Sequence, residues 1–350
     1  MRIAQRMVSR NYMKTLNTSL SNRAESLKRG SDGLAFFKLS DNVADGSRAM
    51  HIQEERYQST QQLANVEDLM SELNSVDSSM ASIHSVLQSV QEKTLMALSD
   101  NYGDDKREVL AKEIGKLKEQ LYQFSNAKFA GKYLFSGTNN SSQPFTTTDD
   151  GKLAFNGVKA EDIFKGDDGK YYYLTDPNDP NSKQEVKNSG NVYADIGLGL
   201  KISSDMQADP RTAFQVSFSG LELLGFGAPV EGENGTEVPT NAYDLLTELE
   251  EAIKPPFDRS KTEDLQRQLI KTTDRVGMAR TDMGTRYNFL EKIQTQLEAD
   301  IDNMSETESR LISSDPAEEA IKMKNCEYVW MAVLQLGSKV LPSSLLDYLR

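Results

Sequence analysis

The hydrophobic positions between residues 41 and 100 repeat every seven residues. Two apolar rows, offset from each other by three residues, together contain Val66, Leu69, Leu73, Val76, Met80, Ile83, Leu87 and Val90, followed by Thr94 and Ala97. Rows with this offset occupy the a and d positions of a coiled-coil seam. No proline interrupts the stretch, and about sixty helical residues would extend over roughly 90 Å. The pattern therefore predicts one long helix with partners along its length.

Two further segments carry apolar stripes at helical spacing. The first follows Gly103, where Asp104 and Asp105 can cap a helix, and its stripe contains Leu110, Ile114, Leu117, Leu121 and Phe124. The second lies between the proline pair 255–256 and Pro316, and its main row contains Leu269, Val276, Met283, Leu290, Leu297, Met304 and Leu311. Its companion row includes Arg286 and Asp300, which we expect to reach solvent or fix the register. Burying a large apolar side chain is worth roughly 1.5–3 kcal/mol, so we expect the three helices to pack together.

Residues 138–255 have a different composition. Turn-rich stretches alternate there with short runs of β-type residues at 152–155, 171–174, 197–202 and 214–218, and a short helix is expected over 244–253. The fold class is therefore predicted as mainly α, with a long antiparallel helical bundle or coiled-coil rod and an inserted β-rich domain. We assign the rod to residues 41–137 and 256–315, the insertion to 138–255, and a discontinuous inner domain to 1–40 and 316–350.

The two ends of the chain also carry apolar helical stripes, although chain termini are usually polar and loosely ordered. These stripes need a surface to bury against, which would be the other terminus or another copy of the protein. We expect the terminal helices to pair on assembly and to be disordered before it. The residues expected at this assembly interface are Ile3, Leu16, Leu20, Leu27, Val333, Leu336, Val340, Leu345, Leu346 and Leu349.

The charge balance narrows the range of partners. Asp and Glu number 53 against 40 Lys and Arg, for a net charge of −13. A protein that neutralises phosphates needs the opposite excess, so we predict no nucleic-acid or membrane partner. No apolar run reaches the roughly 18 residues of a membrane span. The first residues lack the apolar core of a signal peptide, and we expect export without a cleaved signal.

Candidate catalytic chemistry is sparse. The two histidines, His51 and His84, lie on predicted helical surfaces, and the single cysteine, Cys326, lies in an apolar helix and is expected to pack. An enzyme carried on a helical stalk is the alternative from another class, but residues 138–255 contain no histidine or cysteine. We therefore predict no enzyme activity, no catalytic residues, no cofactor and no metal site.

The N-terminal sequence resembles the bacterial flagellin superfamily. The resemblance rests on Ile3, Met7, Leu16 and Leu20, on residues 27–30, and on the stretch from 39 to 49; residues 336–350 resemble the end of the same proteins. The chain departs from the family pattern at Asn42, where a second Asp is more common, and at Gly46, where Ala is. We expect Ser40 and Asp41 still to cap the long helix.

One segment is similar to the hook-associated members of this superfamily, which join the hook to the filament. It contains Gly131, Tyr133, Leu134, Phe135, Ser136 and Gly137, with Pro144 and Phe145 shortly after. The resemblance implies a structural, secreted protein of the flagellum that assembles helically. Its implied partners are other copies of itself, the adjacent hook-associated protein, flagellin, and an export chaperone before secretion. A flagellin that forms the filament itself is the alternative, and polymerisation of the chain alone would distinguish the two.

Overall fold

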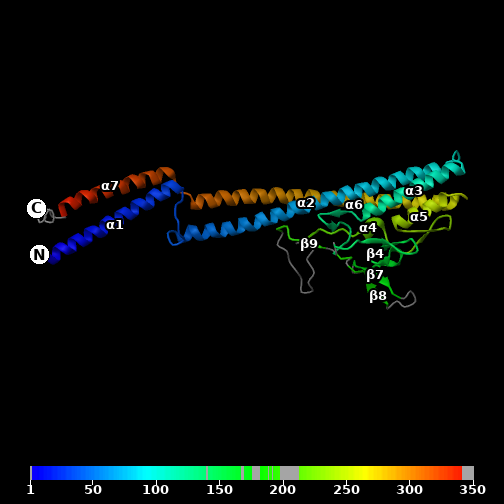
Figure 1. The fold of residues 1–350 in the computed structure, drawn as a ribbon, viewed down its shortest axis with the longest axis horizontal. Helices are drawn as coiled ribbons and strands as arrows, with labels where there is room; N and C mark the ends of the chain where they lie inside the picture. Colours follow the sequence, from blue (N-terminus) through cyan, green and yellow to red (C-terminus); the bar gives the residue numbers. More distant parts are fainter. Residues whose placement is uncertain are drawn as a thin grey trace. The chain divides into compact units, whose positions relative to one another are not determined.

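The computed structural model describes residues 2–138, 141–166, 169–175, 182–187, 189–190, 192–197 and 213–340, and within these ranges side chains are described from residue 7 to residue 337. The chain divides into two compact units. The first contains residues 1–60 and 298–350, and the second contains residues 61–297. Figure 1 shows the elements of each unit. None of the described helices is long and apolar enough to cross a membrane.

The core of the second unit is built on two long helices, α2 (Val43–Leu98) and α6 (Arg259–Ile312). Every position of the two seam rows of α2 from Val66 to Ala97 is buried, as are Leu269, Val276, Met283, Leu290 and Leu297 on α6. Polar contacts also join the helices, because Gln91 Nε2 donates to Thr273 Oγ1 at 2.8 Å and Arg280 Nε donates to Asp77 Oδ1 at 3.1 Å. The seven-residue pattern thus corresponds to a continuous buried seam within this unit.

Two shorter helices complete the helical part of the second unit. Helix α3 (Asp104–Ser125) packs against α5 (Ala242–Ile253). On α3, Leu110, Ile114 and Leu121 are buried, whereas Leu117 and Phe124 are half-buried. The N-cap of α3 is Gly103, which makes no side-chain bond, so Asp104 and Asp105 do not cap the helix as expected. They lie in its first turn, where their negative charge still favours the helix dipole.

The inserted part forms small antiparallel sheets. Strands β3 (Phe145–Thr147), β4 (Leu153–Phe155) and β5 (Val158–Lys159) make one three-stranded sheet, and β6 (Ile163–Lys165), β7 (Tyr171–Leu174) and β8 (Lys183–Glu185) make another. Three two-stranded sheets pair β1 (Lys128–Phe129) with β2 (Lys132–Tyr133), β9 (Tyr193–Ala194) with β10 (Phe214–Gln215), and β11 (Val230–Glu231) with β12 (Glu237–Val238). Two short helical turns, η1 (Ala160–Asp162) and α4 (Gly220–Leu224), lie among them. The fold is mainly α-helical with a β-rich insertion, which confirms the predicted fold class.

The β-type runs predicted from the sequence agree only in part with the observed strands. The run at 171–174 is β7, the run at 152–155 contains β4, and the run at 214–218 is a strand only at Phe214–Gln215. The run at 197–202 lies outside the described residues except for Gly197.

Buried polar side chains attach the insertion to the helices. Asn241 and Asp244 cap α5 reciprocally, and Asp244 Oδ1 also accepts the Leu153 amide of β4 at 2.9 Å. Burial raises the pKa of Asp244, although the hydrogen bonds from Asn241 and Leu153 oppose the rise. On α6, the Asp264 carboxylate accepts the Asn234 amide at 3.0 Å and the Thr236 hydroxyl at 2.7 Å. The bonds to Leu153, Asn234 and Thr236 join segments far apart in sequence. They add to an apolar core in which buried residues of the insertion and of the helices form one cluster.

The first unit contains the terminal helices α1 (Arg2–Asp32) and α7 (Pro316–Val340), which pack along each other, together with the first turns of α2 and the last turns of α6. The connection from α1 to α2 and the connection from α6 to α7 are joined to each other. Leu34 and Ser313 form an antiparallel bridge, flanked by bonds from the Ala35 amide to the Ile312 carbonyl and from the Ser314 amide to the Gly33 carbonyl, at 2.8 and 2.9 Å.

Candidate assembly interface

The contact between α1 and α7 is a seam in which small, polar and large apolar residues are mixed. The positions of α1 turned toward α7 alternate at intervals of three and four residues and include Tyr12, Leu16, Ser19, Arg23 and Ser26. The corresponding positions of α7 are Glu319, Met323, Cys326, Trp330, Val333 and Gly337. The Arg23 guanidinium lies 4.5 Å from the Trp330 ring centroid. At the far end of the seam, a side chain in place of Gly337 would overlap the Tyr12 hydroxyl.

This seam is weakly stabilised in the single chain. Among the described residues of α1 and α7, Val333 is the one apolar side chain that is fully buried, whereas Ser19, Ser26 and Glu319 are buried and polar. The hydroxyls of both serines and Glu319 Oε2 have no hydrogen-bond partner among the described residues. Each unsatisfied buried group costs about 1–3 kcal/mol, which offsets the roughly 1.5–3 kcal/mol of one buried valine.

Many apolar residues of the terminal helices lie outside the seam and are exposed. On α1 the exposed row, which we call the α1 row, recurs every seven residues as Met13, Leu20 and Leu27, and Leu27 is 60% exposed. On α7 the exposed apolar residues are Ile321, Tyr328, Val329, Met331, Leu334 and Leu336. Large apolar rows that remain exposed in a folded chain mark interaction sites.

The residues predicted for assembly divide between these two environments. Leu16 is half-buried and Val333 buried in the seam, while Leu20, Leu27 and Leu336 lie on the exposed side. Ile3 and Val340 lie in α1 and α7 at positions where side chains are not described. Leu345, Leu346 and Leu349 lie outside the described residues. The assembly role of all ten residues stays a prediction.

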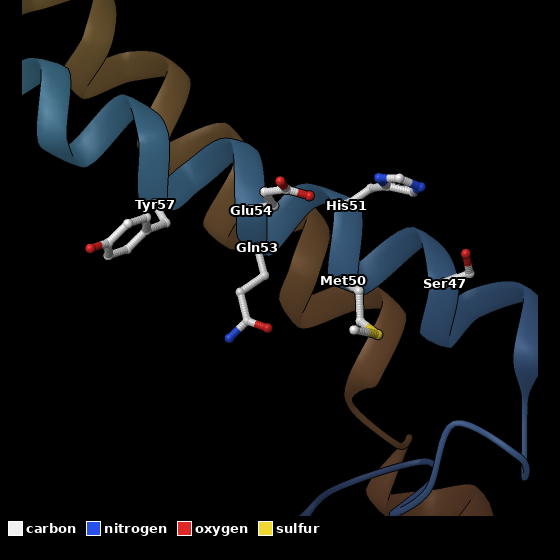
Figure 2. Close-up of a pocket in the computed structure, with 6 residues that line it drawn as sticks. All are labelled: Ser47, Met50, His51, Gln53, Glu54 and Tyr57. Atoms are coloured by element: carbon white, nitrogen blue, oxygen red, sulfur yellow. The ribbon is translucent and has the colours of Figure 1, made fainter.

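A second exposed row, which the sequence reasoning missed, lies on the first turns of α2. Val43, Met50 and Tyr57, here called the α2 row, are 64%, 60% and 68% exposed. A hollow of about 550 Å³ lies along this surface and is lined by Ser47, Met50, His51, Gln53, Glu54 and Tyr57. Figure 2 shows these six side chains projecting from the surface of α2. The seven-residue interval was visible in the sequence, but it is out of phase with the buried seam that starts at Val66.

The contact between α2 and α6 in the first unit combines polar and apolar residues. Arg56 Nε lies 3.0 Å from Glu308 Oε2. A smaller hollow nearby is lined by Ile52, Asp300, Asn303, Met304 and Thr307. Both helix pairs of this unit therefore combine polar and apolar residues in their contacts and leave further apolar rows exposed. In the second unit, by contrast, the seam positions are largely apolar and buried. Asp300 is half-buried in the first unit, and Arg286 in the second unit pairs with Asp282 Oδ2 at 2.8 Å and stacks on Phe218.

The start of α2 departs from the expected capping. Asn42, not Ser40 or Asp41, is the N-cap: its side-chain oxygen accepts the Asp45 amide at 3.2 Å, and its backbone carbonyl accepts the Gly46 amide. Asp41 instead accepts the Lys38 amide at 3.1 Å and closes the preceding turn. Asn is among the best N-cap residues. The Asn that stands at position 42, where Asp is more common in the family pattern, therefore caps the helix one residue later than expected. At Gly46, a side chain would meet Leu39, which packs on this turn.

The predicted motif at residues 131–137, with Pro144 and Phe145, forms a compact structural element. Gly131, at φ +83°, turns the chain between β1 and β2, and Gly137, at φ +72°, ends the motif. Leu134, Phe135, Ser136, Pro144 and Phe145 are buried, and Tyr133 is paired in β2. The Phe135 carbonyl accepts the Gly220 amide. The Asn126 side chain donates to the Phe145 carbonyl and accepts the Phe145 amide. The motif therefore joins the end of α3 to the insertion.

The candidate catalytic side chains are dispersed. His51 is exposed on α2, His84 is half-buried near Gly277, and Cys326 is half-buried in the seam of the terminal helices. No group of three or more His, Cys, Asp or Glu side chains is placed to hold a metal ion within the part of the chain that the structure describes.

Residues 3–140 match the family model described as the bacterial flagellin N-terminal helical region, which confirms the predicted resemblance. No curated protein matches the chain in sequence. A structure from Vibrio parahaemolyticus, a putative flagellar hook-associated protein, is 16% identical with a TM-score of 0.59, covering 78% of this chain and 100% of that one. A structure of Xanthomonas campestris FlgL is 12% identical with a TM-score of 0.51, covering 74% of this chain and 98% of that one. At these identities the likeness establishes a shared fold.

Proposed function

We propose that this chain, which carries the bacterial flagellin N-terminal helical region, is a structural component of the bacterial flagellum that joins the hook region to the filament. The observation that carries the proposal is the arrangement of the terminal helices: polar groups without a partner among the described residues are buried in the seam between them, and many large apolar residues are exposed outside it. Such a pair is poorly stabilised alone and gains stability when neighbours cover its outer rows. The hook-associated role, rather than another flagellar role, is supported by the shared fold and by the Gly131–Gly137 motif.

Assembly would proceed by covering the apolar rows of α1 and α7 with the same helices of adjacent subunits. Each large side chain removed from water contributes roughly 1.5–3 kcal/mol, whereas each ordered residue costs about 1–2 kcal/mol of backbone entropy. A set of exposed leucines and methionines on each helix is therefore needed to make ordering favourable. We expect the terminal helices to be largely unfolded in the free chain and to fold on the growing structure.

The proposal implies a set of partners and a location. The chain would contact other copies of itself, the adjacent hook-associated protein on one side and flagellin on the other. Before export, a chaperone would cover the apolar stripe of the C-terminal helix. Export would occur without a cleaved signal, through the flagellar export channel, to the outside of the cell. Its role would be architectural, with no catalysis.

Deletion of the gene tests the proposal directly. We expect a deletion strain to keep its hooks, to lack filaments and to release flagellin into the medium, because filament subunits would have no surface to add to. Electron microscopy of isolated hooks and immunoblots of the medium measure both effects, and the intact gene in trans should restore filaments. Persistent filaments in the deletion strain would contradict the proposal. Long filaments formed by the purified chain alone would favour the alternative, a filament-forming flagellin.

A further inference from the structure

We infer that the α2 row, formed by Val43, Met50 and Tyr57, binds helix α1 of a second copy of this chain. The inference rests on the proposed function, because it assigns one subunit contact within the assembly. It extends the assembly surface beyond the terminal helices to the first turns of α2. Neither the α1 row nor the α2 row is covered by another element among the described residues, since the large side chains of both are exposed.

The two rows match in spacing and length. Each consists of three large apolar residues at seven-residue intervals: Met13, Leu20 and Leu27 on α1, and Val43, Met50 and Tyr57 on α2. Two heptads rise about 21 Å on a helix, so the rows can lie against each other over their full length. Knobs spaced by seven residues on one helix fit holes with the same spacing on another. The hollow beside Met50 and Tyr57 on α2 offers such a receptacle (Figure 2).

Charge selects α1 rather than α7 as the occupant. Basic residues dominate α1, where Arg2, Arg6, Arg10, Lys14, Arg23, Lys28 and Arg29 stand against Glu25 and Asp32. The turns of α6 that accompany the α2 row are acidic, with Glu298, Asp300, Asp302, Glu306 and Glu308 against Arg310. Helix α7 is balanced, with Glu318, Glu319 and Glu327 against Lys322, Lys324 and Lys339. Complementary charge favours the α1 partner and suppresses the alternatives.

The pairing also has the symmetry that a continuing assembly requires. A contact between two copies of the same row closes into a dimer, whereas a contact between two different patches leaves one of each free on every added copy. The α1 row and the α2 row are different patches on one chain. Their contact can therefore be repeated from copy to copy around a ring or along a helix.

Disulfide cross-linking between copies tests the contact in assembled flagella. The full chain, with Cys326→Ser, is made in two versions that carry Leu20→Cys or Met50→Cys, and both are produced together in the deletion strain. Leu20 and Met50 are the centres of their rows, so they meet in either helix direction. Glu55→Cys replaces Met50→Cys in the matched control, because Glu55 is also exposed but lies on a different side of α2.

We expect mild oxidation of isolated flagella to link the Leu20→Cys chain to the Met50→Cys chain at least tenfold more than to the Glu55→Cys chain. Equal linking to both, no linking, or linking only between two Leu20→Cys chains would overturn the inference. If the first pair impairs assembly, Met13→Cys and Leu27→Cys, each tested against Val43→Cys, take its place. A chain that restores filaments without this link would leave the junction role intact, whereas a native chain that restores no filaments would remove the proposed function itself.

Discussion

Asn42 and Asp45 cap each other at the start of α2. The Asn42 side-chain nitrogen donates to Asp45 Oδ2 at 2.7 Å, and the Asp45 amide returns a bond to Asn42 Oδ1 at 3.2 Å. The same reciprocal pair recurs at the start of α5 between Asn241 and Asp244. In both places an Asn followed three residues later by an Asp satisfies donors that the first helical turn would otherwise leave free.

Replacement of Asn42 by Ala should destabilise the first turn of α2 by about 1 kcal/mol, the usual effect of losing an N-cap. The expected readout is faster hydrogen exchange at the Asp45 amide, which loses its side-chain acceptor. Ser40→Ala is the matched control, because the Ser40 hydroxyl makes only a 3.4 Å contact with Asp41. Equal effects of the two substitutions would place the cap at Ser40 and contradict the assignment.

In the assembled state, where the terminal helices are expected to be folded, replacement of Gly337 by Ala should separate α1 from α7 at that level, because the added methyl group overlaps the Tyr12 hydroxyl. Trp330, the single tryptophan of the chain, lies against Arg23 in the same seam and reports the change through its fluorescence. Gly30→Ala is the control, since nothing lies within 4 Å of a side chain there and helix propensity improves by about 1 kcal/mol. An unchanged Trp330 spectrum in the Gly337 variant would show that the two helices do not meet there.

Two leucines distinguish the buried seam from the exposed rows. Leu290→Ala should lower the free energy of unfolding by about 2–5 kcal/mol, because Leu290 is fully buried and the substitution leaves a cavity. Leu27→Ala should change it by less than about 0.5 kcal/mol in the isolated chain, because Leu27 is exposed. Urea unfolding followed by circular dichroism measures both. Similar losses for the two variants would mean that the exposed row is already covered in the free chain.

The Asp264 carboxylate should make the second unit acid-sensitive. Burial acts to raise its pKa, but the hydrogen bonds from Thr236 and Asn234 and the charge of Arg267 lower the pKa below its ordinary value. A carboxyl whose folded pKa is depressed contributes stability above its unfolded pKa, near 3.9 for Asp, and loses it as the pH falls toward the folded value.

Asp264→Asn should therefore destabilise the chain at neutral pH by about 1–3 kcal/mol, the range for a lost buried acceptor. It should also flatten the decline in unfolding free energy below about pH 4. Asp274→Asn, at an exposed position of the same helix, is the control. A decline on acidification that is as steep in the Asp264 variant as in the native chain would exclude this carboxyl as its source.

The buried seam was predictable because its signal is strong and local. From Val66 to Ala97 the rows repeat without interruption, and apolar periodicity maps directly onto burial when three or more helices share a core. The exact cap was harder to predict. Ser40, Asp41 and Asn42 are all good cap residues, and the choice depends on where the first helical carbonyl accepts its bond, which is set by the packing of Leu39 against Gly46.

The buried polar positions of the first unit could not be predicted by looking for buried apolar rows. Ser19, Ser26 and Glu319 carry no periodic hydrophobic signal, and the exposed rows on α1 and α2 look like core positions in the sequence. Periodicity shows that a face is apolar, but only the arrangement of the helices shows that the face is left outside. The order of the β strands likewise depends on contacts such as Asp244 with Leu153, between residues far apart in sequence.

The bridge between Leu34 and Ser313 has a mechanical consequence. Leu34 lies in the connection from α1 to α2, and Ser313 lies in the connection from α6 to α7. The backbone hydrogen bonds on either side of the bridge join the two connections. A torque applied to α1 is therefore divided between α2 and α6, instead of acting on the α1–α2 connection alone. A subunit in a rotating shaft would transmit rotation through two parallel connections, and neither could swivel alone.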